Sequence, residues 1–303
     1  MALNQARVLV TGATGFIGRH LCRQLVELGA TVYGLSRSAS PATVPAGVIP
    51  MAANVSHRAE IVAALERARP AYVLHLAAAG VTEPFLPMEQ AVEVNVSGII
   101  NVLEASYAVG VRRFVQVGTA YEHPAAEPER GPHNPYVASK LAAWLFWRAF
   151  IEKHTIDAVA VRLFHVYGPQ QVRGLIPAAM QAALQHATFN MTPGEQLRDF
   201  VYIDDVVSGL IACVSSADDA GKTYDLGTGI ARSIRAAVQQ IFAVTNSRGA
   251  VVAGRQPYRP GEAMALTAET ESIYRAYGWR ARVPFEEGIV ITIEAYRQQT
   301  RSL

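Results

Sequence analysis

The segment RVLVTGATGFIG, residues 7–18, constrains the fold of this chain more than any other stretch. It opens with the apolar run 8–10, which is typical of a parallel strand covered by helices on both faces. A glycine turn follows at residues 12–15, and a segment with helical periodicity begins at Phe16. This order of strand, glycine turn and helix predicts an α/β fold built on a doubly wound parallel sheet.

The three glycines of this segment, spaced three residues apart, predict a site for a pyrophosphate. Gly12 permits a tight turn, Gly15 lets the backbone approach a ligand closely, and Gly18 allows the helix to pack closely on the strand. The free amides of the first helical turn and the positive end of the helix dipole then face the anion. The predicted cofactor contacts of this turn are Gly12, Thr14, Gly15, Phe16, Ile17 and Gly18.

Composition sets bounds on the function. A chain of 303 residues can bury one large core or two small ones. Its net charge of +2 favours neither nucleic acid nor an anionic membrane as a partner. No apolar stretch reaches the ~18 residues of a membrane span and no signal peptide is recognisable, so we expect a cytoplasmic protein. Cys22 and Cys213 are expected to be buried thiols, and no metal site is predicted.

The end of the second expected strand, residues 31–35, decides which nicotinamide cofactor fits. An acidic residue there would accept hydrogen bonds from the adenosine ribose and indicate NAD. This chain has Ser36 and Arg37 instead. A hydroxyl and a guanidinium suit a 2′-phosphate, and the missing carboxylate removes a repulsion. The sequence therefore predicts NADP (NADPH) as the cofactor, with a solvated surface position as the alternative for Arg37.

Three residues carry the predicted chemistry. Tyr136 and Lys140 lie four residues apart at the start of an expected helix and thus share one of its faces. Thr119 follows the strand expected at 114–117, at the sheet edge where ligands bind. Proton exchange at neutral pH requires the pKa of a tyrosine to fall by about 3, or roughly 4 kcal/mol, which Lys140 and an oxidised nicotinamide can supply. Thr119, Tyr136 and Lys140 are the predicted catalytic residues.

These motifs together resemble the extended type of the short-chain dehydrogenase/reductase superfamily, which comprises nucleotide-sugar epimerases, dehydratases and reductases. The resemblance is carried by TGATGFIG at residues 11–18, by Thr119 and by the Tyr136–Lys140 pair, and weaker motifs extend it over nearly the whole chain. It implies a Rossmann sheet with a smaller C-terminal α/β substrate domain.

The resemblance also implies the domain boundaries. The expected dinucleotide-binding domain is 1–165, and 166–303 is mainly the nucleotide-sugar domain, with about 205–228 packing back onto the core. The segment 124–135, rich in proline, glutamate and histidine, is expected to frame the sugar.

Further cofactor contacts are implied by the resemblance. Asn54 and Val55 stand where the family has an acid and an aliphatic residue against adenine, so an amide would replace the carboxylate. His75 is interpreted as a core histidine, and the small residues after it would let the backbone pass the cofactor. Asn95 matches a helix-borne asparagine that stabilises the neighbouring strand. The implied contacts are Asn54, Val55, Leu76, Ala77, Ala78, Ala79, Asn95, Val117, Tyr136, Lys140, Phe164 and Val166.

In the second half of the chain, the resemblance implies contacts to a nucleotide diphosphate. Arg198 and Arg259 would bind the diphosphate and Glu262 the ribose, while Asp204 and Asp205 are interpreted as a helix cap and structural contacts. His165 stands where the family has asparagine, and its imidazole can donate a hydrogen bond or act as an acid. The predicted substrate contacts are Thr119, Ala120, Tyr121, His165, Arg198, Arg259 and Glu262.

The residues after Thr119 help to choose the reaction. A 4,6-dehydratase would need an Asp-Glu pair there, whereas this chain has Ala120 and Tyr121, so dehydration is not expected. The NADPH prediction favours reduction of a 4-keto-6-deoxy nucleotide sugar, with Tyr136 as the proton donor. The alternatives are an epimerase with internal redox, a non-catalytic redox sensor, and a reductase of a non-sugar ketone.

Aromatic residues at Trp144, Phe146, Trp147 and Phe150 follow the catalytic pair on the same expected helix. They are too apolar for a solvated face, so they belong either to the core or to a subunit interface. The resemblance implies a homodimer formed through the helix that carries Tyr136 and Lys140.

Overall fold

The computed structural model describes residues 3–125, 133–215 and 219–301. It divides the chain into two compact units, each of which is described by itself. The first unit consists of Met1–Arg162, Val207–Tyr224 and Ser272–Trp279, and the second of Leu163–Val206, Asp225–Glu271 and Arg280–Leu303.

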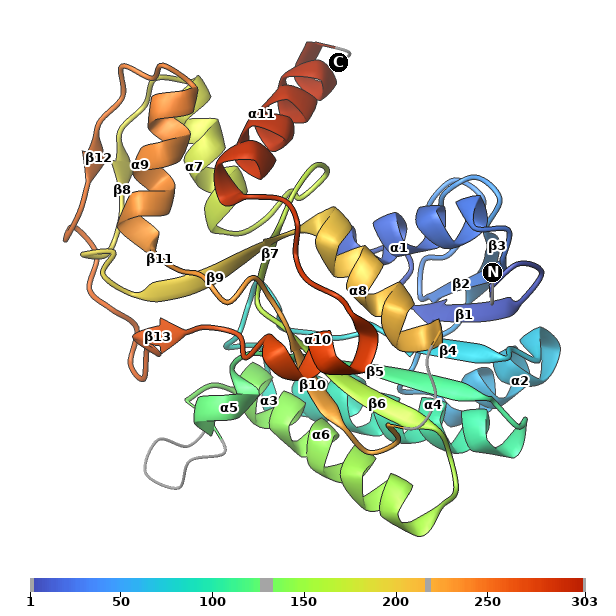
Figure 1. Ribbon diagram of the computed structural model, residues 1–303. Helices are drawn as coiled ribbons and strands as arrows, with labels where there is room; N and C mark the ends of the chain where they lie inside the picture. The colour runs from blue at the N-terminus through green and yellow to red at the C-terminus, as the bar shows by residue number, and fades with distance from the viewer. Residues whose placement is uncertain (1–2, 126–132, 216–218, 302–303) are drawn as a thin grey trace. The chain divides into compact units, whose positions relative to one another are not determined.

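A seven-stranded sheet forms the centre of the fold, in the order β10-β6-β5-β4-β1-β2-β3 (Figure 1). The pairs along β5-β4-β1-β2-β3 are parallel. The chain runs outward from β1 through β2 to β3, then returns to β4 and continues through β5 to the other edge. This reversal confirms the predicted doubly wound sheet and places its switch point between β1 and β4. The strands are β1 (Arg7–Thr11), β2 (Thr31–Ser36), β3 (Ile49–Ala52), β4 (Tyr72–His75), β5 (Arg113–Thr119), β6 (Ala158–Leu163) and β10 (Thr223–Leu226).

Helices cover both faces of this sheet, with α1 on one face and the contacting series α2, α4 and α6 on the other (Figure 1). The sheet is apolar on both faces for this reason, as Val8, Leu9 and Val10 of β1 illustrate by being fully buried. Cys22 and Cys213 are buried free thiols. The helices of this part are α1 (Phe16–Glu27), α2 (Arg58–Ala68), α3 (Met88–Ala91), α4 (Gly98–Ala108), α5 (Glu122–Ala125), α6 (Pro135–Lys153), α8 (Ile203–Ser215) and α10 (Glu271–Tyr277).

One helix differs from its predicted form. The sequence suggests a continuous helix over 91–108, whereas the structure has a π-helical segment, η1 (Val92–Ser97), before α4. π-helical turns insert one residue and recur at functional sites. Here the irregular turn carries Asn95, which is buried and makes three hydrogen bonds outside the helix. Hydrophobic periodicity cannot reveal such a turn because the flanking apolar pattern is still helical.

The second unit has its own small sheet, in which β9 pairs with β11, β13 and β7. Asp199 of β9 organises it, because this buried carboxylate accepts hydrogen bonds from the amides of Thr228, Gly229 and Ala268. Its elements are β7 (His165–Tyr167), α7 (Leu175–Leu184), β8 (Phe189–Asn190), β9 (Leu197–Tyr202), β11 (Ala231–Ser233), α9 (Ile234–Val244), β12 (Val251–Val252), β13 (Ala265–Leu266) and α11 (Phe285–Arg301).

A search of the described helices finds none that combines the length and the hydropathy of a membrane span.

Candidate active site

The glycine turn lies between β1 and α1, at the switch point of the sheet. Gly12 has a φ of +70°, and a Cβ there would lie 3.0 Å from the backbone nitrogen of Ala77. A Cβ on Gly18 would lie 2.2 Å from the carbonyl oxygen of Gly12. Gly15 is the N-cap of α1 and gives it no side-chain cap, which leaves the amides of the first turn to face a ligand. These residues fit the pyrophosphate of a dinucleotide cofactor, whose nicotinamide would exchange a hydride with a substrate.

Thr11, which the sequence analysis missed, fixes the neighbouring strand end. Its Oγ1 accepts hydrogen bonds from the amides of Leu76 and Ala77, both at 3.1 Å, and lies 2.9 Å from Nδ1 of His75. Since both lone pairs are engaged, the hydroxyl proton is donated to Nδ1, and His75 carries its proton on Nε2. Burial and the charge of Lys140 lower the pKa of His75 to about 3. His75 is therefore a neutral core histidine.

The residues predicted to select the cofactor lie just beyond the glycine turn. The Thr14 hydroxyl donates to Ser36 Oγ at 3.2 Å and joins the turn to the end of β2, where Arg37 is exposed. In the loop after β3, the backbone N–H of Asn54 donates a hydrogen bond to the carboxylate of Glu60. Val55 is buried, and its backbone carbonyl accepts a hydrogen bond from the side chain of Asn101.

Asn95 joins the strand end at Ala79 to the catalytic helix. Its side chain accepts from the amide of Ala79 at 2.8 Å and donates to the carbonyl of Ala79 at 3.0 Å. Its second N–H donates to Ser139 Oγ at 2.8 Å. Ser139, another residue that the sequence analysis missed, lies between Tyr136 and Lys140 on α6. The hydrogen bonds through Asn95 therefore fix the position of α6 relative to the chain at Ala79.

Thr119, Tyr136 and Lys140 come together at the carboxyl end of β5. Tyr136 stands in the first turn of α6, whose N-cap Asn134 accepts from the amide of Val137 at 2.9 Å. A side-chain hydrogen bond joins Tyr136 to Thr119. The Lys140 ammonium is buried one turn further on and donates to the carbonyl of Val117 at 2.6 Å. Thr119 and Tyr136 can thus address the same substrate oxygen.

The electrostatics of the phenol are set chiefly by its burial. Burial raises the pKa of Tyr136 above its ordinary value, and the hydrogen bond from Thr119 only partly opposes this. The predicted depression of this pKa depended on Lys140 together with an oxidised nicotinamide and stays a prediction; in the protein by itself, the Lys140 ammonium donates to the Val117 carbonyl. Burial also lowers the pKa of Lys140, while the charge of Glu122 acts to raise it. In this state the phenol is held protonated.

Glu122 is the main site residue that the sequence analysis missed. Its side chain is 2% exposed, and its Oε1 accepts from the amide of Thr119 at 2.9 Å. Its Oε2 forms an ion pair with Nε of Arg162 at 3.4 Å. The spacing Thr-x-x-Glu was the available signal, since a glutamate in the first turn of a helix commonly reaches back to the amide three residues earlier. Between them, Ala120 is buried and Tyr121 is half-buried.

The predicted substrate residues of the second unit divide into an engaged pair and an exposed residue. Arg198 is buried, forms an ion pair with Glu262, and donates to the carbonyls of Leu197 at 2.9 Å and Ala263 at 2.7 Å. Arg259 is exposed. The structure therefore brings Arg198 and Glu262 into direct contact with each other.

His165 of β7 packs edge-on against Phe200 at 5.8 Å, and burial together with the charge of Arg198 lowers its pKa to about 3. Phe164 and Val166 flank it in the same unit, where the amide of Val166 donates to the carbonyl of Phe164. Asp205 accepts from the amides at 282 and 283, which is a structural contact rather than a cap.

Two other features bear on the site. Part of the segment expected to frame the sugar, residues 126–132, lies outside the described residues. Throughout the described part of the chain, no group of three or more His, Cys, Asp or Glu side chains is arranged to hold a metal ion.

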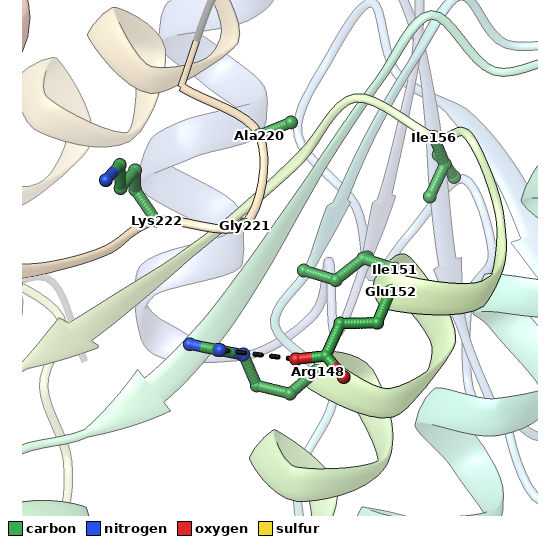
Figure 2. A pocket seen from close by; sticks show the side chains of 7 residues that line it. All are labelled: Arg148, Ile151, Glu152, Ile156, Ala220, Gly221 and Lys222. Carbon is green, nitrogen blue, oxygen red and sulfur yellow. Dashed lines mark hydrogen bonds and ion pairs between the residues drawn. The ribbon is translucent and has the colours of Figure 1, made fainter.

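The pocket in Figure 2 lies along the second half of α6, where Arg148 pairs with Glu152 at 3.4 Å. At ~1.5 Å per residue, Arg148 is about 18 Å along the helix from Tyr136, so this pocket is separate from the catalytic residues. Its lining residues are Arg148, Ile151, Glu152, Ile156, Ala220, Gly221 and Lys222.

Residues 8–227 match the model of the NAD dependent epimerase/dehydratase family. The chain belongs to this family. The match spans the glycine turn, Thr119, Tyr136, Lys140 and the return strand β10, and it confirms the nucleotide-sugar group of the extended short-chain dehydrogenases/reductases that the motifs indicated.

Relatives in this family catalyse different reactions. The chain is 29% identical to dTDP-D-glucose 4,6-dehydratase of Mus musculus, over 96% of this chain and 89% of that protein. It is 32% identical to dTDP-6-deoxy-L-talose 4-dehydrogenase (NAD(P)(+)) of Kitasatospora kifunensis, over 78% of each. Among solved structures, UDP-glucose 4-epimerase of Thermus thermophilus in complex with NAD is similar with a TM-score of 0.84 and 28% identity, covering 96% of this chain and 99% of that one.

Proposed function

We propose that this protein is an NADPH-dependent reductase of a 4-keto-6-deoxy nucleotide sugar. The observation that carries the proposal is the hydrogen bond between Thr119 and Tyr136, with Lys140 one turn away. Burial raises the pKa of this phenol, so Tyr136 carries its proton at neutral pH, and the positive charge of Lys140 would favour release of that proton to the substrate oxygen. The dehydrogenase relative also supports redox chemistry at a sugar carbonyl.

In the proposed reaction, the glycine turn at residues 12–18 would hold a nicotinamide cofactor, which would provide the hydride for the carbonyl carbon. Tyr136 donates its phenolic proton to the carbonyl oxygen, and the Thr119 hydroxyl donates a hydrogen bond to the same oxygen and orients it. Lys140 places a positive charge next to the phenol, which stabilises the phenolate left behind. Thr119 and Lys140 are buried and Tyr136 is half-buried, so water screens the interactions among them less than at an open surface.

The preference for NADPH rests on the end of β2. Ser36 is held by Thr14 at the edge of the glycine turn, and the exposed side chain of Arg37 is free to reach outward from it. A guanidinium beside a hydroxyl suits a 2′-phosphate. The known structure with NAD supports a nicotinamide cofactor in this fold.

For the substrate we propose a nucleotide diphosphate sugar, bound by Arg198, Arg259, Glu262 and His165. Arg198 already has Glu262 and two carbonyls as partners, so diphosphate binding would compete with the Glu262 ion pair. Arg259 is exposed and would provide the first positive charge for the phosphates.

An epimerase with internal redox is the second candidate, because the Thermus enzyme of similar structure is a UDP-glucose 4-epimerase with NAD. Dehydration has less support despite the mouse relative, since Ala120 and Tyr121 occupy the places where the acid pair is needed. The deciding experiment mixes the protein with NADPH and a freshly generated keto-sugar nucleotide and follows nicotinamide absorbance. Stoichiometric oxidation of NADPH supports the reductase, and conversion of the sugar without net oxidation supports the epimerase. If neither oxidation nor sugar conversion is observed, both candidate functions are contradicted.

We also propose a homodimer through α4 and α6. Of the aromatic residues on α6, Trp147 is fully buried in the core, whereas Phe146 is 52% and its neighbour Leu145 54% exposed. Tyr107 on α4 is also exposed, and the two helices pack together. Sedimentation should give a dimer that Phe146→Glu converts to monomer, while Val172→Glu, at an exposed apolar position of the second unit, should leave it intact.

A further inference from the structure

We propose that Glu122 is a positioning residue of the catalytic centre, holding the main chain of Thr119 in place and balancing the buried charge of Lys140. This inference rests on the proposed function of the site, since it assigns Glu122 a part in the same proton transfer.

Both carboxylate oxygens are engaged by groups of the neighbouring strands. Oε1 accepts from the amide of Thr119 on β5 at 2.9 Å, and Oε2 faces Nε of Arg162 on β6 at 3.4 Å. Burial raises the pKa of Glu122, while the charge of Lys140, the hydrogen bond from the Thr119 amide and the charge of Arg162 act to lower it and favour the ionised carboxylate. The bond to the amide fixes the residue whose hydroxyl meets Tyr136, so displacement of Glu122 would move that hydroxyl.

The Glu122 carboxylate occupies space that is open because residue 118 of β5 is a glycine. A Cβ on Gly118 would lie 2.5 Å from Oε1 and 2.8 Å from Oε2 of Glu122. The backbone of Gly118 is not left-handed, so glycine is required here by the close approach of the carboxylate rather than by conformation. The glycine next to the catalytic threonine thus has a specific physical reason.

The charges around Glu122 form one group at the carboxyl edge of the sheet. Lys140 on α6 is attracted by the Glu122 charge, which opposes the effect of its burial. The Glu122 charge also raises the pKa of Tyr136, and thus keeps the proton donor protonated. His75 on β4 is neutral, while Arg162 compensates the carboxylate from the far side.

The outer side of this group is closed by further contacts of Arg162. Its guanidinium lies 2.6 Å from Nε2 of the exposed His123, which follows Glu122 on α5, and 5.7 Å from the Trp144 ring on α6. Tyr121, the residue before Glu122, also acts on the phenol and raises its pKa. Because Arg162 also contacts His123 and Trp144, it should stay in place when the Glu122 charge is removed. The buried Lys140 then loses the negative charge that Glu122 supplies.

The scarcity of lysine makes a direct test possible. Lys140, Lys153 and Lys222 are the three lysines of the chain, so isotope-labelled lysine gives three side-chain NMR signals, assignable by single replacements with arginine. In the protein without cofactor or substrate, Glu122→Gln should move the titration of Lys140 to lower pH and leave those of Lys153 and Lys222 unchanged. Glu152→Gln, at an exposed glutamate of α6, is the matched control and should leave Lys140 unchanged.

Kinetics give the second readout. Glu122→Gln should lower kcat by about ten- to a hundredfold with KM for the sugar nucleotide within about twofold, because the hydroxyl and the ammonium are misplaced while binding groups remain. The basic limb of the pH profile should shift to lower pH, since loss of a negative charge lowers the pKa of Tyr136. Gly118→Ala, which displaces the carboxylate without removing it, should also lower kcat and guards against a folding defect in the first variant.

An unchanged Lys140 titration together with an unchanged kcat in folded Glu122→Gln would overturn the inference. A loss of kcat in Glu122→Gln without movement of Lys140 or of the pH profile would also overturn it, since it would leave only a structural role. The NMR titration needs no turnover, so it remains decisive if the protein proves to be an epimerase or fails to oxidise NADPH. Failure of the proposed function and failure of this inference are thereby distinguishable.

Discussion

An arginine pairs with one or more carboxylates near each end of strand β5, but the two clusters are built differently. At the amino end, Arg113 pairs with Asp157 and with Asp219 at 2.8 Å, and donates to Tyr277 at 2.7 Å and to the Cys213 carbonyl at 2.8 Å. The guanidinium is 2% exposed and joins segments distant in sequence.

At the carboxyl end, Glu122 accepts a hydrogen bond from the backbone of Thr119 and pairs with Arg162 at 3.4 Å. The charge of Glu122 also acts on Tyr136 and Lys140, the predicted catalytic residues. Parallel sheets place ligands at the carboxyl ends of their strands. In the proposed mechanism, the same chemical pair stabilises the fold at one edge of the sheet and positions the reacting groups at the other. Substitutions at the two edges should therefore separate stability from activity.

The largest expected effect is at the carboxyl edge. Tyr136→Phe removes the proton donor while keeping the ring, and should lower kcat by about 10³- to 10⁴-fold, equivalent to ~4–5.5 kcal/mol. Its thermal midpoint should stay close to that of the parent protein. Steady-state assays and calorimetry would check both points, with Tyr107→Phe on the exposed side of α4 as the control. Near-normal turnover by Tyr136→Phe would contradict the assignment.

The matching change at the amino edge is Arg113→Met. It leaves Asp157 and Asp219 without their buried cation and should lower the free energy of unfolding by about 3–5 kcal/mol. The kcat of the molecules that remain folded at low temperature should be unchanged. Urea unfolding would measure the loss, and Arg112→Met, one residue earlier and exposed, should have little effect. A large drop in kcat without loss of stability would break the comparison.

A smaller effect is expected for Arg37, just beyond the carboxyl end of β2. Arg37→Ala should weaken NADPH binding by about 1.5–3 kcal/mol through loss of a charged hydrogen bond, and leave NADH binding nearly unchanged. Fluorescence titration with both cofactors gives the two affinities, and Arg67→Ala on the exposed side of α2 serves as a control. Equal affinity of the parent protein for NADPH and NADH would mean that the NADP prediction is wrong.

The smallest expected effect, counted per pH unit, is that of His75 on the free energy of unfolding. It sharpens the comparison because His75 lies at the carboxyl edge of the sheet but is expected to affect stability. Its pKa is about 3 in the fold against an ordinary value of 6.5, so between these pH values only the unfolded chain binds the proton. Its contribution to stability is therefore complete above pH 6.5 and falls by up to ~1.4 kcal/mol per pH unit as the pH is lowered toward 3.

The His75→Asn variant keeps an acceptor for Thr11 and should show a flatter decline of stability between pH 7 and 5, measured by urea unfolding at each pH. The same substitution at the exposed His133 is the control and should keep the slope of the parent protein. Parallel slopes for all three proteins would rule out a buried neutral imidazole at position 75.

Much of the fold was predictable because its signals are local. Strand β1, the glycine turn and α1 are consecutive in sequence, and the apolar residues of 175–184 by themselves indicate the helix that the structure has there, α7 (Leu175–Leu184). The meeting of Thr119 with Tyr136 followed from two short motifs and the rule that ligands bind at the carboxyl edge of the sheet.

The rest depends on contacts between distant residues, which periodicity cannot supply. Arg113 and Tyr277 are 164 residues apart in sequence. The raised pKa of Tyr136 follows chiefly from its burial in the folded chain, and the Lys140 ammonium donates to a carbonyl of β5, so neither could be predicted from local sequence. The engagement of Arg198 by Glu262 likewise needs the pairing of β9 with β13.

The π-helical turn Val92–Ser97 contains one residue more than a regular α-helical turn. This residue sets the angle, about the helix axis, between the segment before the turn and α4. Deleting one residue there would restore regular α-helical winding and turn the preceding segment by about 100° relative to α4. The amide of Asn95 would then swing away from Ala79 and Ser139, and the strand end beside the cofactor turn would lose its tie to the catalytic helix. This turn is therefore a position where chain length itself is under constraint.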